Sequence, residues 1–71
     1  MAEEIRAEIV ANVAQVAVHE GDTVTHETMV VLLEPMKMEI PVVPEGSGVI
    51  TRIAVSRGDV VQEGDLIAVV E

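Results

Sequence analysis

The sequence predicts an all-β domain, a sandwich or barrel of about seven or eight short strands. Short apolar segments rich in β-branched residues alternate with turns that contain Gly, and Val, the commonest residue, favours pleated and half-buried surfaces. The chain also repeats itself at a fixed offset. Its 71 residues give room for one small core, and because none of them is Phe, Trp or Tyr, that core must be aliphatic.

The expected strands follow one another with a turn sequence between them. Residues 3–9 are predicted to form a strand or a frayed end, because Ile5 and Ile9 alone would make a thin helical stripe. The apolar segments predicted as strands are residues 9–18, 30–33, 40–43, 49–55 and 66–70. Gly in each intervening turn can adopt the positive φ that tight turns require. These turns are Glu20-Gly21-Asp22, residues 44–48, Arg57-Gly58-Asp59 and Glu63-Gly64-Asp65.

An internal repeat aligns residues 15–34 with residues 52–71 without a gap, at an offset of 37 positions. The two copies share the pattern apolar-Ala-Val-x-x-Gly-Asp-x-Val and are identical at six of twenty aligned positions. Two copies are too few for a solenoid, which needs at least about three. The repeat therefore predicts one pseudo-two-fold domain over residues 1–71. Its pseudo-repeats are about residues 12–34 and 49–71, with a hairpin at residues 34–40 between them.

Composition and charge exclude several classes of function. Thirteen acidic residues against four basic ones give a net charge of −9, and no aromatic side chain is present to stack on bases, so no nucleic-acid partner is expected. The chain has no Cys, which removes thiolate catalysis and Cys-based zinc sites. The spacing of His19 and His26 matches no metal-ligand pattern, so no metal site is predicted.

The apolar segments are also too short for a membrane span. The longest apolar runs have five residues, 29–33 and 66–70, whereas a transmembrane helix needs about 20. The acidic N-terminus lacks the apolar stretch of a signal peptide. We therefore expect no membrane partner and a cytoplasmic location.

The segment between the two repeats is predicted to present one lysine. Residues 30–34 and 39–43 can run as antiparallel strands, with the tight turn at residues 35–38. Pro35 presets φ near −65° and suits a strand end, and Pro41 is expected at an edge or a strand margin. Lys37, the only lysine of the chain, then projects from the tip of a hairpin.

The neighbours of Lys37 are unusual for a surface. Met36 and Met38 are flexible apolar side chains that gain nothing from burial at an exposed tip. Their presence is explained if another protein binds the tip. The alternative remains that an isolated exposed lysine has no role and that the two Met fill the core at the strand ends.

The motif Glu34-Pro35-Met36-Lys37-Met38-Glu39 resembles the attachment motif of biotinyl domains, commonly Glu-Ala/Ser-Met-Lys-Met-Glu. Residues 12–22, 48–59 and 61–66 resemble the strands and Gly-Asp turns of the same family, so the match covers residues 9–71. The chain is thus similar to the biotin/lipoyl attachment domains, including small stand-alone biotinylated proteins and biotin carboxyl carrier domains. It departs from their pattern at Pro35 (usually Ala or Ser), at Ala11 (usually Gly) and at Glu27-Thr28 (usually Gly-Asp or Gly-Gln).

The resemblance implies a fold. It is a flattened barrel of two four-stranded antiparallel sheets with a quasi-two-fold internal repeat, called a barrel-sandwich hybrid. In that fold the modified lysine lies on a hairpin tip opposite the two termini.

The resemblance also implies a function as a carrier rather than as an enzyme. Lys37 would be joined to biotin by a biotin protein ligase that recognises Met36, Met38, Glu34 and Glu39. The biotin would then carry carboxylate between biotin carboxylase and carboxyltransferase subunits.

Two alternatives stay open from the sequence. Lipoyl carriers share the fold and the hairpin lysine, but they usually place Asp before that lysine and a small residue after it. Met36 and Met38 therefore favour biotin over lipoate. The other alternative is an unmodified interaction or scaffold module that binds a basic partner through its acidic surface. The same acidic residues also suit simple solubility of a Val-rich β domain.

Overall fold

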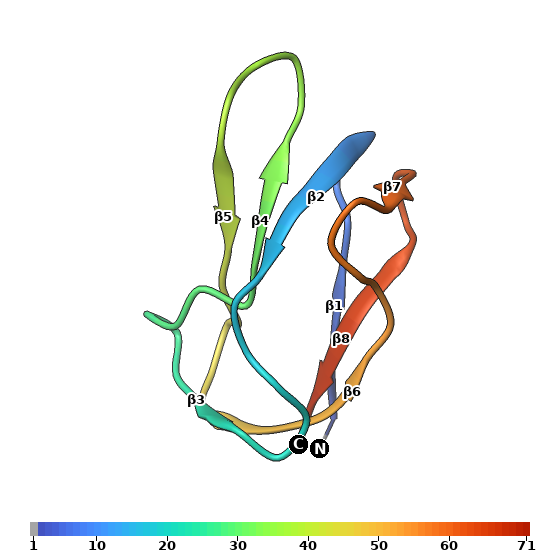
Figure 1. The fold of residues 1–71 in the computed structure, drawn as a ribbon. Helices are drawn as coiled ribbons and strands as arrows, with labels where there is room; N and C mark the ends of the chain where they lie inside the picture. Colours follow the sequence, from blue (N-terminus) through green and yellow to red (C-terminus); the bar gives the residue numbers. More distant parts are fainter. Residues whose placement is uncertain (1) are drawn as a thin grey trace.

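The computed structural model describes residues 2–71, which form eight β-strands in two four-stranded antiparallel sheets (Figure 1). One sheet has the strand order β1-β8-β6-β3 and the other β5-β4-β2-β7. The strands are β1 (Glu3–Arg6), β2 (Ala11–Val16), β3 (Thr23–Val24), β4 (Val31–Glu34), β5 (Ile40–Val42), β6 (Gly48–Ile53), β7 (Val60–Val61) and β8 (Leu66–Val70). The predicted fold class is confirmed. Within residues 2–71 no helix is long and apolar enough to cross a membrane.

The offset of 37 residues relates one sheet to the other. It takes β2 to β6, β3 to β7, β4 to β8 and β1 to β5, so it converts the order β1-β8-β6-β3 into β5-β4-β2-β7. Register irregularities lie at equivalent places, between Val13 and Gln15 in β2 and between Ile50 and Arg52 in β6. The repeat seen in the sequence is therefore a quasi-two-fold symmetry of the structure.

The Gly-Asp turns link the two halves. The Gly21 N–H donates to the Ile50 carbonyl oxygen at 2.7 Å, and the Ile50 N–H donates to the Asp22 carbonyl oxygen at 2.9 Å. Gly58 and Asp59 make the same two bonds to Val13, each at 2.8 Å. Each turn thus binds the central strand of the other half. The short strands also pair with strands of the other half: β3 lies beside β6, and β7 lies beside β2. Neither half therefore contains a complete sheet.

The core between the sheets is aliphatic, as the composition predicts, and among residues 2–71 no polar or charged residue is buried. The buried apolar residues come from both halves: Ile5, Ala7, Ala11, Val13, Val18, Val24, Val30, Val31, Leu33, Ile50, Val61, Ile67, Ala68 and Val70. Gly48 borders this core in a place without room for a side chain. A Cβ there would lie 2.6 Å from the Glu71 carbonyl oxygen and 2.6 Å from Val70 Cγ1.

Several predicted strand limits are wrong. Residues 9–18 do not form one strand, because the chain crosses from one sheet to the other between β1 and β2. Ile9 and Val10 lie in that connection and are 42% and 54% exposed. The predicted strand at residues 49–55 ends at Ile53. Residues 3–6 do form a strand, since β1 pairs with β8.

The turn that departs from the family pattern still forms. The Thr28 hydroxyl oxygen accepts a hydrogen bond from the Thr25 N–H at 3.0 Å. At the equivalent turn in the second half, an Asp65 carboxylate oxygen accepts from the Gln62 N–H at 2.8 Å. A hydroxyl therefore replaces the carboxylate as the acceptor in the first half.

Candidate functional site

The hairpin of β4 and β5 carries the residues singled out by the sequence. Leu33 pairs with Ile40 and Leu32 with Pro41, so the two strands lie in register up to the turn. Pro41 lies in an edge strand, as predicted, where its missing N–H costs no hydrogen bond within the sheet. In Figure 1 the hairpin projects at one end of the molecule and the two chain ends meet at the other.

The quasi-two-fold symmetry explains why this turn has no counterpart in the repeat. The equivalents of β4 and β5 are β8 and β1. These two strands pair with each other, and Glu3 lies opposite Val70. Because β1 is the first strand in chain order and β8 the last, no turn joins that pair, and residues 35–39 have no equivalent within residues 2–71.

The turn itself holds two residues in a rare backbone conformation. The Met38 N–H donates to the Pro35 carbonyl oxygen at 2.9 Å, which closes a four-residue turn. Met36 and Lys37 have φ of 51° and 65°, and among residues 2–71 they are the only non-Gly residues with positive φ. Turns with positive φ at both central positions usually contain Asn-Gly, because other L-residues cost about 1–2 kcal/mol each in this region. Backbone strain is thus concentrated at Lys37 and its neighbour.

The side chains at the tip are exposed, as predicted. Met36 is 89% exposed and Met38 60% exposed, so neither fills the core. Lys37, Glu34 and Glu39 are exposed as well. Within residues 2–71, Lys37 Nζ makes no ion pair and no hydrogen bond. The hairpin therefore presents a primary amine to solvent between two apolar side chains.

Pro35 marks the boundary between the tip and the body of the domain. It is buried, whereas the four residues that follow it are exposed. The sequence suggested only that its ring would fix φ. Its burial shows that the turn is anchored in the protein immediately before the strained pair.

The two histidines lie away from any cluster of potential ligands. His19 Nδ1 is 3.8 Å from an Asp22 carboxylate oxygen, and His26 Nε2 is 3.6 Å from a Glu27 carboxylate oxygen. Both imidazoles are largely exposed. In the part of the chain that the structure describes, no three His, Asp or Glu side chains come together in a way that could hold a metal ion.

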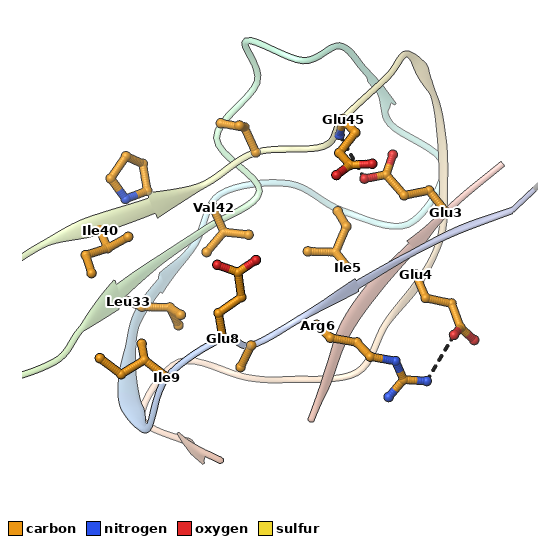
Figure 2. A pocket seen from close by; sticks show the side chains of 13 residues that line it. Glu3, Glu4, Ile5, Arg6, Glu8, Ile9, Leu33, Ile40, Val42 and Glu45 are labelled. Carbon is orange, nitrogen blue, oxygen red and sulfur yellow. Dashed lines mark hydrogen bonds and ion pairs between the residues drawn. The ribbon is translucent and has the colours of Figure 1, made fainter. Parts of the chain in front are cut away.

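A groove of about 600 Å³ lies between β1 and β5, and the sequence reasoning missed it (Figure 2). One wall is residues 3–9, the other is residues 40–43 with Glu45, and Leu33 lies between them. The signal was available, because the offset of 37 aligns these two segments as equivalent strands. Two equivalent strands at the edges of different sheets face each other across the quasi-two-fold axis.

Comparison with known proteins gives a family match over almost the whole chain. The profile of the family described as "Biotin-requiring enzyme", a biotin/lipoyl family, matches residues 3–70. The chain is 56% identical over 70 residues to "Biotinylated protein TB7.3 homolog" of Mycobacterium leprae, and the match covers 99% of each chain.

Solved structures show the same fold. The urea carboxylase of Kluyveromyces lactis matches with a TM-score of 0.92 and 32% identity. That match covers all of this chain (100%) but only 6% of the carboxylase. The lipoyl domain of the 2-oxoglutarate dehydrogenase complex of Azotobacter vinelandii matches with a TM-score of 0.77 and 25% identity, over 94% of this chain and 95% of the domain.

Proposed function

Because this chain belongs to the biotin/lipoyl family of biotin-requiring enzymes, we propose that it is a biotin carrier and that biotin is attached to Lys37. One observation carries the choice of residue. The only lysine of the chain lies in a strained turn at the tip of a hairpin, exposed between two exposed Met. Similarity to a biotinylated protein over 99% of the chain supports the choice of cofactor.

The residues at the tip fit this cofactor chemically. Biotin has a carboxyl group, and attachment forms an amide between its carboxyl carbon and Lys37 Nζ with loss of the elements of water. The reaction removes one positive charge and takes the net charge from −9 to −10. Amide formation also requires the amine to lose a proton, and no side chain within residues 2–71 hydrogen-bonds Lys37 Nζ, so the ligase would have to provide the base.

The exposure of the neighbours of Lys37 supports recognition of this turn by a biotin protein ligase. Met36 and Met38 offer apolar contact on either side of the lysine, and both are exposed before any partner arrives. Glu34 ends β4, and Glu39 comes directly before β5, so two carboxylates flank the base of the turn. We assign ligase recognition to these four residues.

As a carrier, the domain contributes position rather than catalysis. When bound, biotin supplies the chemistry of carrying a carboxylate between the two half-reactions of a carboxylase. The paired strands β4 and β5 hold Lys37 out from the core, so that the side chain can enter the active sites of other proteins. The proposed partners are a biotin protein ligase, a biotin carboxylase and a carboxyltransferase. The similar domain within a urea carboxylase supports the carboxylase partners.

Intact mass tests this proposal directly. After incubation with a biotin protein ligase, biotin and MgATP, we expect the protein to gain the mass of one biotin less one water and to bind avidin. Lys37→Arg keeps the positive charge but removes the only lysine, so we expect it to gain nothing. A wild-type protein that stays unmodified, while the same ligase labels a known carrier domain, would contradict the proposal.

A further inference from the structure

The groove between β1 and β5 has an apolar floor. Ile5, Leu33 and Val42 line it from three strands of the two sheets. Figure 2 shows the side chains of Ile5, Glu8 and Val42 directed into the space between the two strands. The floor is continuous with the core of the domain, of which Ile5 and Leu33 are members.

The two walls of the groove differ in chemistry although they are equivalent in fold. The offset of 37 pairs Glu3 with Ile40, Glu4 with Pro41 and Arg6 with Val43. The β1 wall is therefore charged where the β5 wall is apolar. Only one equivalent pair is acidic on both sides, Glu8 and Glu45, and both residues line the groove.

The single cation at the groove is already engaged. Arg6 Nη2 lies 3.0 Å from a Glu4 carboxylate oxygen, and Arg6 Nη1 donates to the Gly64 carbonyl oxygen at 2.9 Å. Glu3 accepts a hydrogen bond from the Glu45 N–H at 2.8 Å across the groove. Within residues 2–71 this leaves the carboxylates of Glu8 and Glu45 without a cationic partner.

The backbone of β1 is also available along the groove. β1 and β5 are the edges of their sheets, and among the described strands none pairs with β1 on the side away from β8. Pro41 removes a donor from β5, which makes that strand a poor template for pairing. An extended segment can therefore form main-chain hydrogen bonds with β1 rather than with β5.

We propose that this groove binds an extended basic segment of a partner protein. Apolar side chains on one face of the segment would pack on Ile5, Leu33 and Val42, while Lys or Arg side chains would reach Glu8 and Glu45. The free edge of β1, Glu3–Arg6, spans about 13 Å, which is room for about four residues of the segment to pair with it.

The groove lies beside the base of the hairpin that carries Lys37. Its wall includes Leu33 and Ile40, the last residue pair before the turn that carries Lys37. A segment bound there lies at the base of the hairpin without covering the tip. This binding does not depend on the modification of Lys37, so it stands apart from the proposed carrier function.

A defined peptide tests the docking surface. The probe is the acetylated and amidated hexapeptide Val-Lys-Val-Lys-Val-Lys, titrated into the ¹⁵N-labelled full chain with amide chemical shifts as the readout. We expect shift changes concentrated in residues 3–9 and 40–45. Control peptides replace Lys by Glu, which removes the charge match, or Val by Gly, which removes the apolar face, and we expect both to bind more weakly.

Matched charge variants separate the groove from the net charge. Glu8→Gln with Glu45→Gln and Glu27→Gln with Glu63→Gln each change the net charge from −9 to −7. Because exposed ion pairs contribute about 0.2–1 kcal/mol each, we expect the first pair to weaken binding about three- to tenfold. The second pair, which lies outside the groove, should change it less than twofold, and Lys37→Arg should leave it unchanged.

Three outcomes would overturn the proposal. One is the absence of binding. Another is a set of shift changes spread over all acidic surfaces, and the third is an equal loss of affinity in both double variants. Either of the last two would mean that the peptide senses only net charge.

Discussion

The two ends of this molecule are built from equivalent strands and yet differ in what they present. At one end β4 and β5 are joined by a strained turn that carries exposed Met36, Lys37 and Met38. At the other end β8 and β1 form the same antiparallel pair, and no turn joins them, because β1 is the first strand and β8 the last. The symmetric core thus supplies two equivalent strand pairs, and one of them carries a strained turn that exposes a lysine.

The exposed apolar residues also differ between equivalent positions of the two halves. Ile9, Val10 and Val60 are 42%, 54% and 61% exposed, and the residues at the equivalent positions are Gly46, Ser47 and Thr23. The division is incomplete, because Val43 and Val49 are 43% and 39% exposed and their equivalents are Arg6 and Asn12. An exposed apolar residue whose equivalent is Gly or polar is therefore not required by the fold and is a property of its own surface.

The largest predicted effect concerns packing near the chain ends. Gly48→Ala places a Cβ 2.6 Å from both the Glu71 carbonyl oxygen and Val70 Cγ1, so we expect a loss of about 2–3 kcal/mol in the free energy of unfolding. The equivalent residue in the other half is already Ala11, which is buried without such a clash. Denaturation in urea measures the change.

The control for this prediction is Ala11→Gly. We expect a smaller loss of about 1–2 kcal/mol, because Gly increases the conformational entropy of the unfolded chain and the buried methyl group of Ala11 is lost. Equal losses at the two positions would show that the halves do not differ in packing there. Retained biotinylation of Gly48→Ala would show that this end of the domain takes no part in the reaction.

The next prediction addresses the tip. Replacing Met38 by Asp substitutes a charge for an exposed apolar side chain, so we expect little change in stability. We expect kcat/KM for biotinylation to fall about tenfold, which corresponds to about 1.4 kcal/mol of lost contact with the ligase. Labelling kinetics followed by intact mass provide the measurement, with Met38→Leu as the apolar control. Unchanged labelling of the Asp variant would mean that the ligase does not recognise the Met38 side chain.

The sequence predicted the architecture better than the local backbone. The repeat, the Gly-containing turns and the β-branched apolar segments between them, such as residues 66–70, predicted the strands. The exposed Lys37 followed from the turn. The two-residue strands β3 and β7 are too short to show periodicity, and each forms only because a strand from the other half lies beside it.

The positive φ at Met36 and Lys37 had no signal in the sequence, because neither residue favours that conformation. The surrounding strands impose it. The groove was missed for a different reason. Its walls are far apart in sequence, and only the alignment of the two halves brings residues 3–9 opposite residues 40–43 and Glu45.

The smallest predicted effect measures this strain. At Met36, with φ of 51° and a side chain that is 89% exposed, Gly removes the steric penalty and sacrifices almost no burial. The gain of about 1–2 kcal/mol is offset by about 0.4–1 kcal/mol of added unfolded-state entropy, so we expect Met36→Gly to stabilise the domain by about 0.5–1 kcal/mol. Met38→Gly is the matched control. Its φ is not positive, so only the entropic loss applies and we expect destabilisation. If both variants lost stability, the turn would store no strain, and the rigid presentation of Lys37 would have to be attributed to the flanking strands alone.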